Sequence, residues 1–460
     1  MEIKSKLHAI KLEYLFIVIY IIMGVMSSLA FPMFHIPDEP NHFLRAYEIS
    51  EGHLISELKG RGAGNVLPDK LMFKGLDIRK SKWSDYSRYW NQRIDRNHPH
   101  FYNFSNISLY APTNYIMQTA GIIVTRLFTD RTLLLAYGGR FLNWLFAGVC
   151  IFFAIRLIPR WKLLLFAIAF IPMSIHQYAS LSADVPLIAV SLLYISFIFK
   201  LREQHKQLST RQLILLYVMA WFLALTKIVY LPLVFCILLL PSRLFSSPKA
   251  RYLHVAGIAG GAILLNLLWL KESSHLLAAS HKSDTDPQAQ TIYVLTHPYQ
   301  YLKTLYHTVK IHGLRLWDTM FGSLLGWLDI KIRHRYILGY QIILLISGLA
   351  SLCKLDEKES ESSSLAWYER LLLLGICVGT MLLMATALYV QWTPYKKTII
   401  DGLQGRYYLP LLLPFFISIL PDRLPVKLMH KPLVSTLFVI AILIINIFVF
   451  LSPIRYELGM

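Results

Sequence analysis

Charged residues are scarce in this chain of 460 residues: only 16% of the positions are Asp, Glu, Lys or Arg, whereas 55% are hydrophobic. This balance is too apolar for a soluble protein of this size. Apolar stretches recur along the whole sequence, and many are long enough to cross a hydrocarbon core of about 30 Å. The composition therefore predicts an all-α polytopic membrane protein.

Cysteines and nucleotide-binding or hydrolase motifs are also rare or missing. The four cysteines lie in or beside apolar stretches, so a disulfide framework is not expected. The sequence contains no GxxxxGK loop, no HExxH, no paired CxxC and no GxSxG. It therefore gives no support for ATP-driven chemistry, for a zinc-dependent hydrolase or for a serine hydrolase with a nucleophile elbow. We expect no obligatory cofactor and no dedicated metal site, although a divalent cation stays open. Asp284 and Asp286 could pair around one, but their polar loop favours simple solvation.

Acidic residues are outnumbered by Lys and Arg, 27 against 46, which gives a formal net charge of +19. Short basic loops at 156–162, 200–211 and 423–431 alternate with apolar stretches, and this is the positive-inside pattern. No nucleic-acid motif accompanies the charge. The apolar run after the basic start lacks a small-residue cleavage site and is interpreted as an uncleaved first span. We therefore expect a multi-pass protein with a cytoplasmic amino terminus.

The apolar stretches predict eleven transmembrane helices in a single integral-membrane domain, residues 1–460. They lie near 12–33, 133–155, 162–180, 184–200, 212–225, 228–241, 252–270, 335–352, 367–390, 407–420 and 432–452. If 110–127 also crossed, the basic loop 156–162 would face outward, so we expect 110–127 to lie on the outer surface. Residues 34–132, with juxtamembrane helices, and 271–334 then form two large extracytoplasmic loops. We find no internal repeat of the kind that inverted-repeat transporters carry.

The most distinctive run, IPDEPNHF, directly follows the first span and places the adjacent carboxylates of Asp38 and Glu39 where the chain leaves the membrane. The proline after them suits the first turn of a helix whose N-cap would be Asp38. On that helix Asp38, His42 and Arg45 fall at i, i+4 and i+7 and share one face. The run indicates an acid/base cluster, and a plain helix cap explains the two acids equally well.

Cations at the ends of apolar stretches could hold a lipid phosphate. Lys227 lies between two short apolar segments, where it needs water, a carboxylate or an anion, unless it snorkels to the interface. Arg406 lies at the start of a late apolar stretch, and its planar guanidinium is suited to binding phosphate oxygens. The alternative is that Arg406 is an anchor at the membrane interface. Arg140, after two glycines, is interpreted in the same way.

Other polar residues at these positions are candidates for binding substrate. Asp184 in the motif SADVP could face the first carboxylates across a cavity, or simply cap its helix. Tyrosines beside the arginine of QGRYY and in YAPTNY could stack on a sugar or anchor at the interface. The candidate substrate-binding residues are His42, Arg45, Asp184, Tyr110, Asn114, Gln404 and Tyr407.

Six runs occur in a fixed order: PDEPNHFLRAYEISEG, YAPTNY, SADVPL, LTKIVYLPL, FGSLLGWLD and DGLQGRYYLPLLLP. Together they resemble the bacterial integral-membrane family known as domain of unknown function 2142, over most of the chain. That family in turn resembles, in layout, the GT-C class of membrane glycosyltransferases, which includes protein mannosyltransferases and the aminoarabinose transferase of lipid A.

The resemblance implies a GT-C-like bundle whose first external loop carries an acidic catalytic residue just after the first span. By position it implies Asp38 as the general base, Glu39 as its neighbour in the catalytic site, and Arg140 as the arginine at the mouth of the second span. With Arg406 and Lys227, which were selected for their charge, Arg140 completes the candidate ligands of the donor phosphate. Donors in that class are sugars on polyprenyl phosphate or pyrophosphate. The implied activity is inverting sugar transfer to a cell-envelope glycan, lipid or protein at the extracytoplasmic face of the bacterial cytoplasmic membrane, without a nucleic-acid partner.

Three rival functions remain. A transporter or flippase of lipid-linked sugars would also have basic residues at the ends of its transmembrane helices, but it would not need paired carboxylates on a helix in an external loop. An O-antigen-type polymerase or ligase shares the donor but usually relies on a large late external loop, whereas the largest loop here is the first. A catalytically silent assembly partner is the third alternative.

Overall fold

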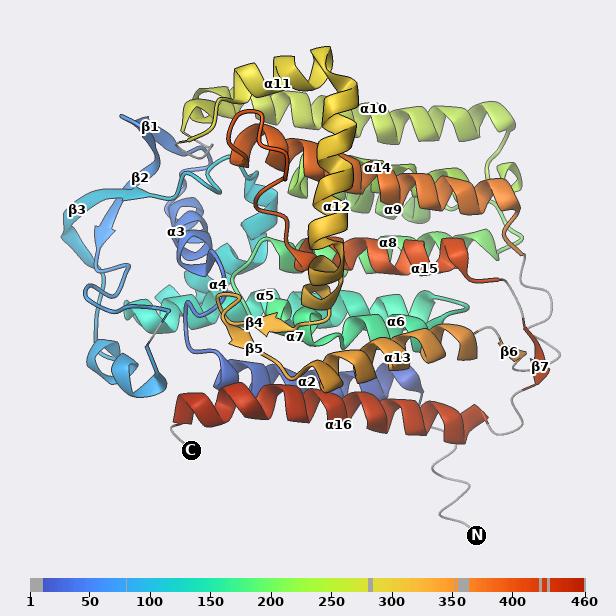
Figure 1. The fold of residues 1–460 in the computed structure, drawn as a ribbon, viewed down its shortest axis with the longest axis horizontal. Coiled ribbons are helices and arrows are strands. Elements are labelled where there is room, and N and C mark those ends of the chain that lie inside the picture. The colour runs from blue at the N-terminus through green and yellow to red at the C-terminus, as the bar shows by residue number, and fades with distance from the viewer. Residues whose placement is uncertain are drawn as a thin grey trace, which may run out of the picture.

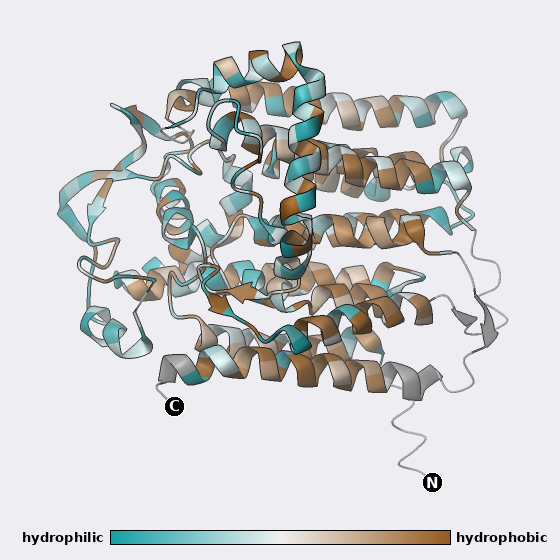
Figure 2. Ribbon diagram, viewed as in Figure 1, coloured by the Kyte–Doolittle hydropathy of each residue, from teal (hydrophilic) through white to brown (hydrophobic). Residues whose placement is uncertain are grey.

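The protein is a bundle of long helices that lie side by side with their axes roughly aligned (Figure 1). The structure, a computed structural model, describes residues 11–79, 81–279, 284–351, 353–354, 364–421, 424–427 and 431–458. Apolar residues dominate the bundle helices, and polar residues gather at the end that carries α3 and a three-stranded sheet (Figure 2). We call this end the polar end.

The bundle helices coincide with the apolar stretches of the sequence. They are α2 (Leu12–Ala30), α5 (Thr132–Leu157), α6 (Lys162–Ala169), α7 (Pro172–Tyr178), α8 (Asp184–Arg202), α9 (Thr210–Thr226), η4 (Ile228–Leu239), α10 (Pro248–Ser273), α13 (His334–Ala350), α14 (Trp367–Trp392), η8 (Gly405–Leu411), α15 (Leu412–Ile419) and α16 (Lys431–Leu458).

Six helices of the described chain are long and apolar enough to cross a membrane, rather than the eleven expected. They span Leu12–Ala30, Thr132–Leu157, Asp184–Arg202, Pro248–Ala278, Trp367–Trp392 and Thr436–Arg455. The other stretches form shorter or broken helices; for example, the stretch 162–180 is interrupted between α6 and α7 at Pro172. Six such helices are enough to make the chain a polytopic membrane protein.

The loop 34–132 forms a cap on the polar end. It contains α3 (Glu39–Ser50), β1 (Glu57–Lys59), β2 (Gly62–Asp69), η2 (Trp83–Tyr89), β3 (Asp95–Asn103), η3 (Pro112–Tyr115) and α4 (Ile116–Arg126). The three strands form an antiparallel sheet in the order β1-β2-β3. The sequence did not predict this sheet, because the glycines and the proline of β2 are typical of turns.

Helix α4 has 11 residues and is about 17 Å long, too short to cross a bilayer, which agrees with a helix on the surface. It packs closely on α5. A Cβ atom at Gly121 would lie 2.1 Å from the carbonyl oxygen of Gly138, so only glycine allows this approach of the two backbones.

The segment 271–334 is not a simple loop. It contains η6 (Ser274–Ala278), α11 (Pro287–Thr296), α12 (Pro298–Met320), β4 (Leu324–Leu325) and β5 (Ile330–Lys331). Helix α12 runs across the direction of the bundle helices (Figure 1). At the opposite end of the bundle, η5 (Ser242–Leu244) precedes α10, and β6 (Cys353–Lys354) pairs with β7 (Leu424–Lys427).

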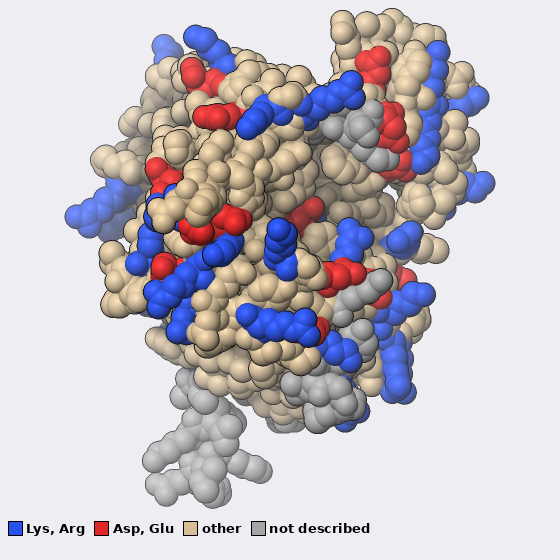
Figure 3. Space-filling view, turned by 90° about the vertical axis from the view of Figure 1, so that its left-hand side faces the viewer, with Lys and Arg blue, Asp and Glu red and all other residues tan. Residues whose placement is uncertain are grey.

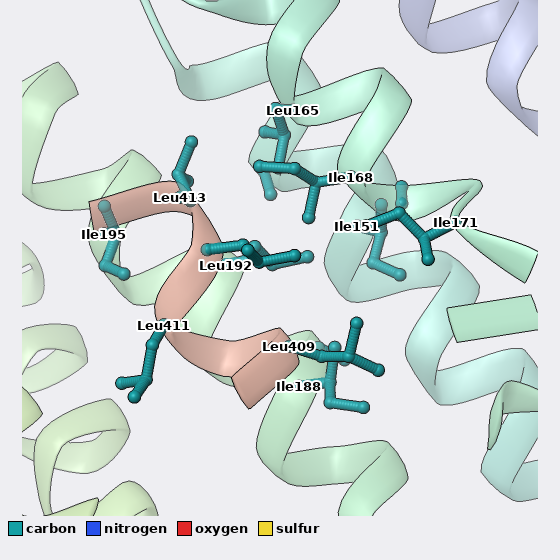
Figure 4. Close-up of a cluster of buried hydrophobic side chains, with 14 of the residues drawn as sticks. Ile151, Leu165, Ile168, Ile171, Ile188, Leu192, Ile195, Leu409, Leu411 and Leu413 are labelled. Carbon is teal, nitrogen blue, oxygen red and sulfur yellow. The ribbon is translucent and has the colours of Figure 1, made fainter. Parts of the chain in front are cut away.

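A core of aliphatic side chains fixes η8 in the bundle. Leu409, Leu411 and Leu413 contribute to it from η8 and α15 (Figure 4). Their partners come from three helices: Ile188, Leu192 and Ile195 of α8, Ile151 of α5, and Leu165 and Ile168 of α6. Each buried Leu or Ile contributes roughly 1.5–3 kcal/mol, so the position of η8 is set by packing. This packing fixes the backbone that carries Arg406.

Candidate functional site

Asp38 lies in the turn between α2 and α3, with a φ of 64° in the left-handed region. Asp38 is the N-cap residue of α3, as expected, but its side chain makes no cap hydrogen bond to the helix. The carboxylate instead accepts hydrogen bonds from Arg406 Nη2 (3.1 Å) and Asn106 Nδ2 (3.2 Å). A left-handed conformation outside glycine is sustained only where the surroundings fix it. Here it turns a side chain that is 35% exposed towards the cations of the bundle.

Arg406, Lys227 and Asp184 extend this contact into a charge cluster. The Arg406 side chain on η8 is only 3% exposed, and its Nε lies 3.7 Å from Asp184 Oδ2. Lys227, between α9 and η4, forms an ion pair with Asp184 Oδ1. Two carboxylates and two cations therefore alternate along the cluster. Asp184, the first residue of α8, pairs with both cations instead of capping its helix.

Two tyrosine rings line the same cluster. The Lys227 ammonium lies 5.2 Å from the ring centre of Tyr110 and 5.3 Å from that of Tyr407, within the range of cation–π attraction. The Arg406 guanidinium lies 5.5 Å from the Tyr407 ring. The Tyr230 hydroxyl donates to the Tyr407 carbonyl (2.7 Å) and so fixes this segment.

The guanidinium of Arg406 has spare donors. Its Nε and Nη1 atoms are buried and have no hydrogen-bond partner in the part of the chain that the structure describes. A buried polar group without a partner costs about 1–3 kcal/mol, and more when it is charged. These two donors are chemically suited to an anion, which makes Arg406 a candidate anion-binding residue.

Glu39 and Arg140 lie elsewhere, in a buried ion pair of their own. Arg140 Nε and Nη2 each donate to a Glu39 oxygen at 2.6 Å, and the two side chains are 0% and 4% exposed. Glu39 also accepts from the backbone N–H groups of Phe34 (2.9 Å) and Leu181 (3.0 Å). Arg140 donates further to two carbonyls at the end of α2. In the structure Glu39 and Arg140 bind each other and the backbone, and the pair fixes the turn that holds Asp38. The catalytic role of Glu39 and the phosphate-binding role of Arg140 stay predictions.

Arg45 is also occupied within the cap. It forms an ion pair with Glu48 and donates to Ser56 Oγ (3.3 Å) and to the carbonyls of Leu54 (2.8 Å) and Tyr110 (3.2 Å). The side chain is fully buried. Arg45 fixes the backbone of Tyr110, and its contact with substrate stays a prediction.

The remaining candidates lie beside the cluster. His42 Nδ1 is 2.9 Å from the Tyr115 hydroxyl, and its ring stacks on Tyr110. Asn114 donates to the carbonyl of Thr226 (2.7 Å), directly before Lys227, and therefore positions the lysine. Gln404 directly precedes η8, and its side-chain oxygen has no hydrogen-bond partner among the described residues.

Two asparagines were missed by the sequence analysis. Asn41 donates to Asn106 Oδ1 (2.7 Å), and Asn106 donates to Asp38, so the three side chains form a hydrogen-bonded chain. Asn106 follows β3 and comes close only because the unexpected sheet places it there. No spacing in the sequence marks it.

The described residues contain no group of three or more His, Cys, Asp or Glu side chains that could hold a metal ion. Asp286, one of the two loop acids, accepts a hydrogen bond from the N–H of Ala289 (3.0 Å) and caps α11. Seen from the polar end, acidic and basic residues surround a hollow between the main body and the lobe that includes α11 and α12 (Figure 3).

Two buried imidazoles make the fold sensitive to acid. Burial lowers the pKa of His42 and that of His35 from 6.5 to about 4. Near His42, carboxylates oppose this shift and cations assist it. The unfolded chain therefore binds these protons at a higher pH than the folded protein does. The contribution of these two imidazoles to stability is constant at neutral and higher pH, and it falls as the pH drops through 6.5 towards about 4. At about pH 5 each ring lowers stability by about 2 kcal/mol.

We expect the melting temperature in detergent solution to fall between about pH 7 and about pH 5. His42→Gln does not titrate and should lose part of this dependence. The exposed His53→Gln is the matched control and should keep it. An unchanged pH profile in His42→Gln would show that the imidazole is not buried in its neutral form.

The fold and this cluster define a class: a polytopic helical membrane protein with a charged, aromatic-lined site at one end of its bundle. A family model described as predicted membrane protein (DUF2142) matches residues 21–414. The chain belongs to this family. No curated protein and no solved structure gives a significant match to it.

Proposed function

We propose that this protein is an inverting, GT-C-like glycosyltransferase that moves a sugar from a polyprenyl-phosphate donor to a cell-envelope glycan, lipid or protein. The proposal includes a location in the bacterial cytoplasmic membrane with the site on its extracytoplasmic face. One observation carries it: the partly exposed carboxylate of Asp38 lies 3.1 Å from a buried arginine whose Nε and Nη1 atoms donate no hydrogen bond within the described residues.

In this proposal Arg406 and Lys227 bind the donor phosphate. A guanidinium binds phosphate oxygens through parallel hydrogen bonds, and Arg406 has donors to spare. Lys227 adds a second positive charge. Both residues sit at the ends of apolar helices, so an isoprenoid tail can remain in the hydrocarbon while its phosphate reaches the cluster.

Asp38 is the proposed general base. The acceptor hydroxyl attacks the anomeric carbon from the face opposite the phosphate, and its proton passes to Asp38. The bond between the anomeric carbon and the phosphate oxygen breaks, and its electron pair leaves on polyprenyl phosphate. Fixed cations stabilise the charge that develops on this leaving group. The proton then passes from Asp38 to water.

The other residues position these groups. Asn106 orients the carboxylate of Asp38, and the pair of Glu39 and Arg140 holds the turn before it. The rings of Tyr110 and Tyr407 offer apolar faces on which a sugar can stack.

The test is to incubate the purified protein with a panel of polyprenyl-phosphate sugars and an envelope extract, and to follow free polyprenyl phosphate and labelled product. Transfer of label from at least one donor is expected. A parallel arm contains a chelator, which measures any dependence on a divalent cation. Movement of intact donor across proteoliposomes without bond cleavage would identify a flippase and overturn the proposal.

Replacing Arg406 by Gln should weaken donor binding about 10–100-fold, because a charge-assisted hydrogen bond contributes about 1.5–3 kcal/mol. Arg406→Lys keeps the charge but loses the fork, and it should recover only part of the affinity. Binding is measured by equilibrium titration with a fluorescent polyprenyl phosphate. The exposed Arg88→Gln is the matched control for the change in net charge. Equal affinity in Arg406→Gln and Arg88→Gln would remove Arg406 from the donor site.

A further inference from the structure

We propose that α12 lies at the membrane surface on the polar end of the bundle and binds the anionic headgroups of phospholipids with its outward face. The surface comprises Tyr299, Leu302, Lys303, Tyr306, Val309, Lys310 and Leu314. The proposal does not depend on the glycosyltransferase activity.

The first argument is that α12 turns its apolar side away from the protein and its threonines towards it. The side that packs on the protein buries Thr304 and Thr308, whereas the opposite side exposes large apolar residues. Tyr306 is 63% exposed and Leu314 is 85% exposed. An exposed apolar face of this extent needs a nonpolar partner, and a lipid interface supplies one.

The second argument is the depth of α12 along the bundle. Tyr301 of α12 bonds the hydroxyl of Thr386 on α14 (2.6 Å). Nineteen residues separate Thr386 from Trp367, the exposed aromatic residue that begins α14. That length of helix spans about 28 Å, close to the hydrocarbon thickness of about 30 Å. If Trp367 marks one interface, α12 lies at the other, and it runs across the bundle helices as a surface helix must (Figure 1).

The third argument is charge. From Pro298 to Trp317 the helix carries Lys303, Lys310 and Arg315 and no acidic residue. Lys303 lies 4.8 Å from the ring centre of Tyr299. Lysines beside exposed tyrosines are typical of residues at headgroup level. Each such cation strengthens binding to an anionic lipid surface about five-fold.

Helix α12 also touches the charge cluster. A Cβ atom at Gly405 would lie 2.2 Å from the backbone nitrogen of Met320, so the end of α12 packs directly against the residue before Arg406. If α12 lies at the level of the headgroups, Arg406 therefore lies close to the depth of the lipid phosphates.

The first experiment measures depth. A nitroxide is attached at Leu314→Cys in nanodiscs, and its accessibility to oxygen and to a water-soluble nickel complex is compared with that of a label at Glu57→Cys on the exposed strand β1. We expect Leu314 to be protected from nickel and accessible to oxygen, and Glu57 to show the reverse. Equal exposure of both labels to nickel would overturn the interfacial placement.

The second experiment measures headgroup selectivity with spin-labelled phosphatidylglycerol against phosphatidylcholine. Replacing both Lys303 and Lys310 by Gln should lower the preference for phosphatidylglycerol about 20-fold at the sites these residues form. The control replaces the exposed Arg61 and Lys74 by Gln, with the same change in net charge. An equal effect of the two pairs, or no effect of the first, would overturn headgroup binding by α12.

Discussion

Asp38→Asn should lower the rate of sugar transfer about 10²–10⁴-fold, the usual contribution of a positioned general base. The fold should survive, because the carboxylate is 35% exposed and the amide oxygen of Asn still accepts a hydrogen bond from Arg406. The measurement is product formation under single-turnover conditions with saturating donor. Glu57→Gln removes an exposed carboxylate from the same cap and should retain full activity. Wild-type activity in Asp38→Asn would exclude Asp38 as the base.

Donor affinity separates this role from a structural one. In the structure Arg406 Nη2 donates to Asp38, whereas Arg406 Nε and Nη1 donate no hydrogen bond within the described residues. A donor phosphate that binds these two nitrogen atoms leaves the contact between Arg406 and Asp38 in place. Asp38→Asn should therefore bind donor as well as the wild type. A large loss of affinity would mean that Asp38 contacts the donor rather than the acceptor.

Sequence reasoning identified the members of the cluster but not its geometry. Asp38 and Arg406 lie 368 positions apart, and only tertiary structure brings them together. Each could be found separately, because a charge beside an apolar span needs a partner or a function. Asp184 and Lys227 were proposed for different tasks, although they form an ion pair with each other.

The ion pair between Glu39 and Arg140 could not be predicted, because local sequence does not reveal which distant residues become partners. Both were assigned to chemistry, yet a buried carboxylate and a buried guanidinium satisfy each other. Their positions differ by 101, so no helical spacing links them.

Helix α12 and strand β2 were missed for a related reason. In α12 the large apolar residues share the outward face with lysines, and the inward face carries threonines, so the usual pattern of an apolar side buried in the protein is reversed. In β2 the residues glycine and proline are typical of a turn. Both elements are stabilised by tertiary contacts rather than by local propensity.

Glu39→Gln should give the largest loss of stability, about 3–5 kcal/mol, because it leaves the buried Arg140 without its counter-charge. The amide can replace some hydrogen bonds but not the charge. The measurement is thermal unfolding in detergent. Asp401→Asn breaks the exposed pair with Lys397 and should cost less than about 1 kcal/mol.

A double variant separates the pair from its surroundings. Arg140→Met in the Glu39→Gln background removes the orphaned charge, so it should recover part of the stability, whereas Arg140→Met alone should be strongly destabilising. Recovery would remain incomplete because the N–H groups of Phe34 and Leu181 lose their carboxylate acceptor. Activity should not recover, since the turn that directs Asp38 towards Arg406 depends on the same carboxylate. Strictly additive losses would show that Glu39 and Arg140 act independently, contrary to the ion pair that joins the cap to α5.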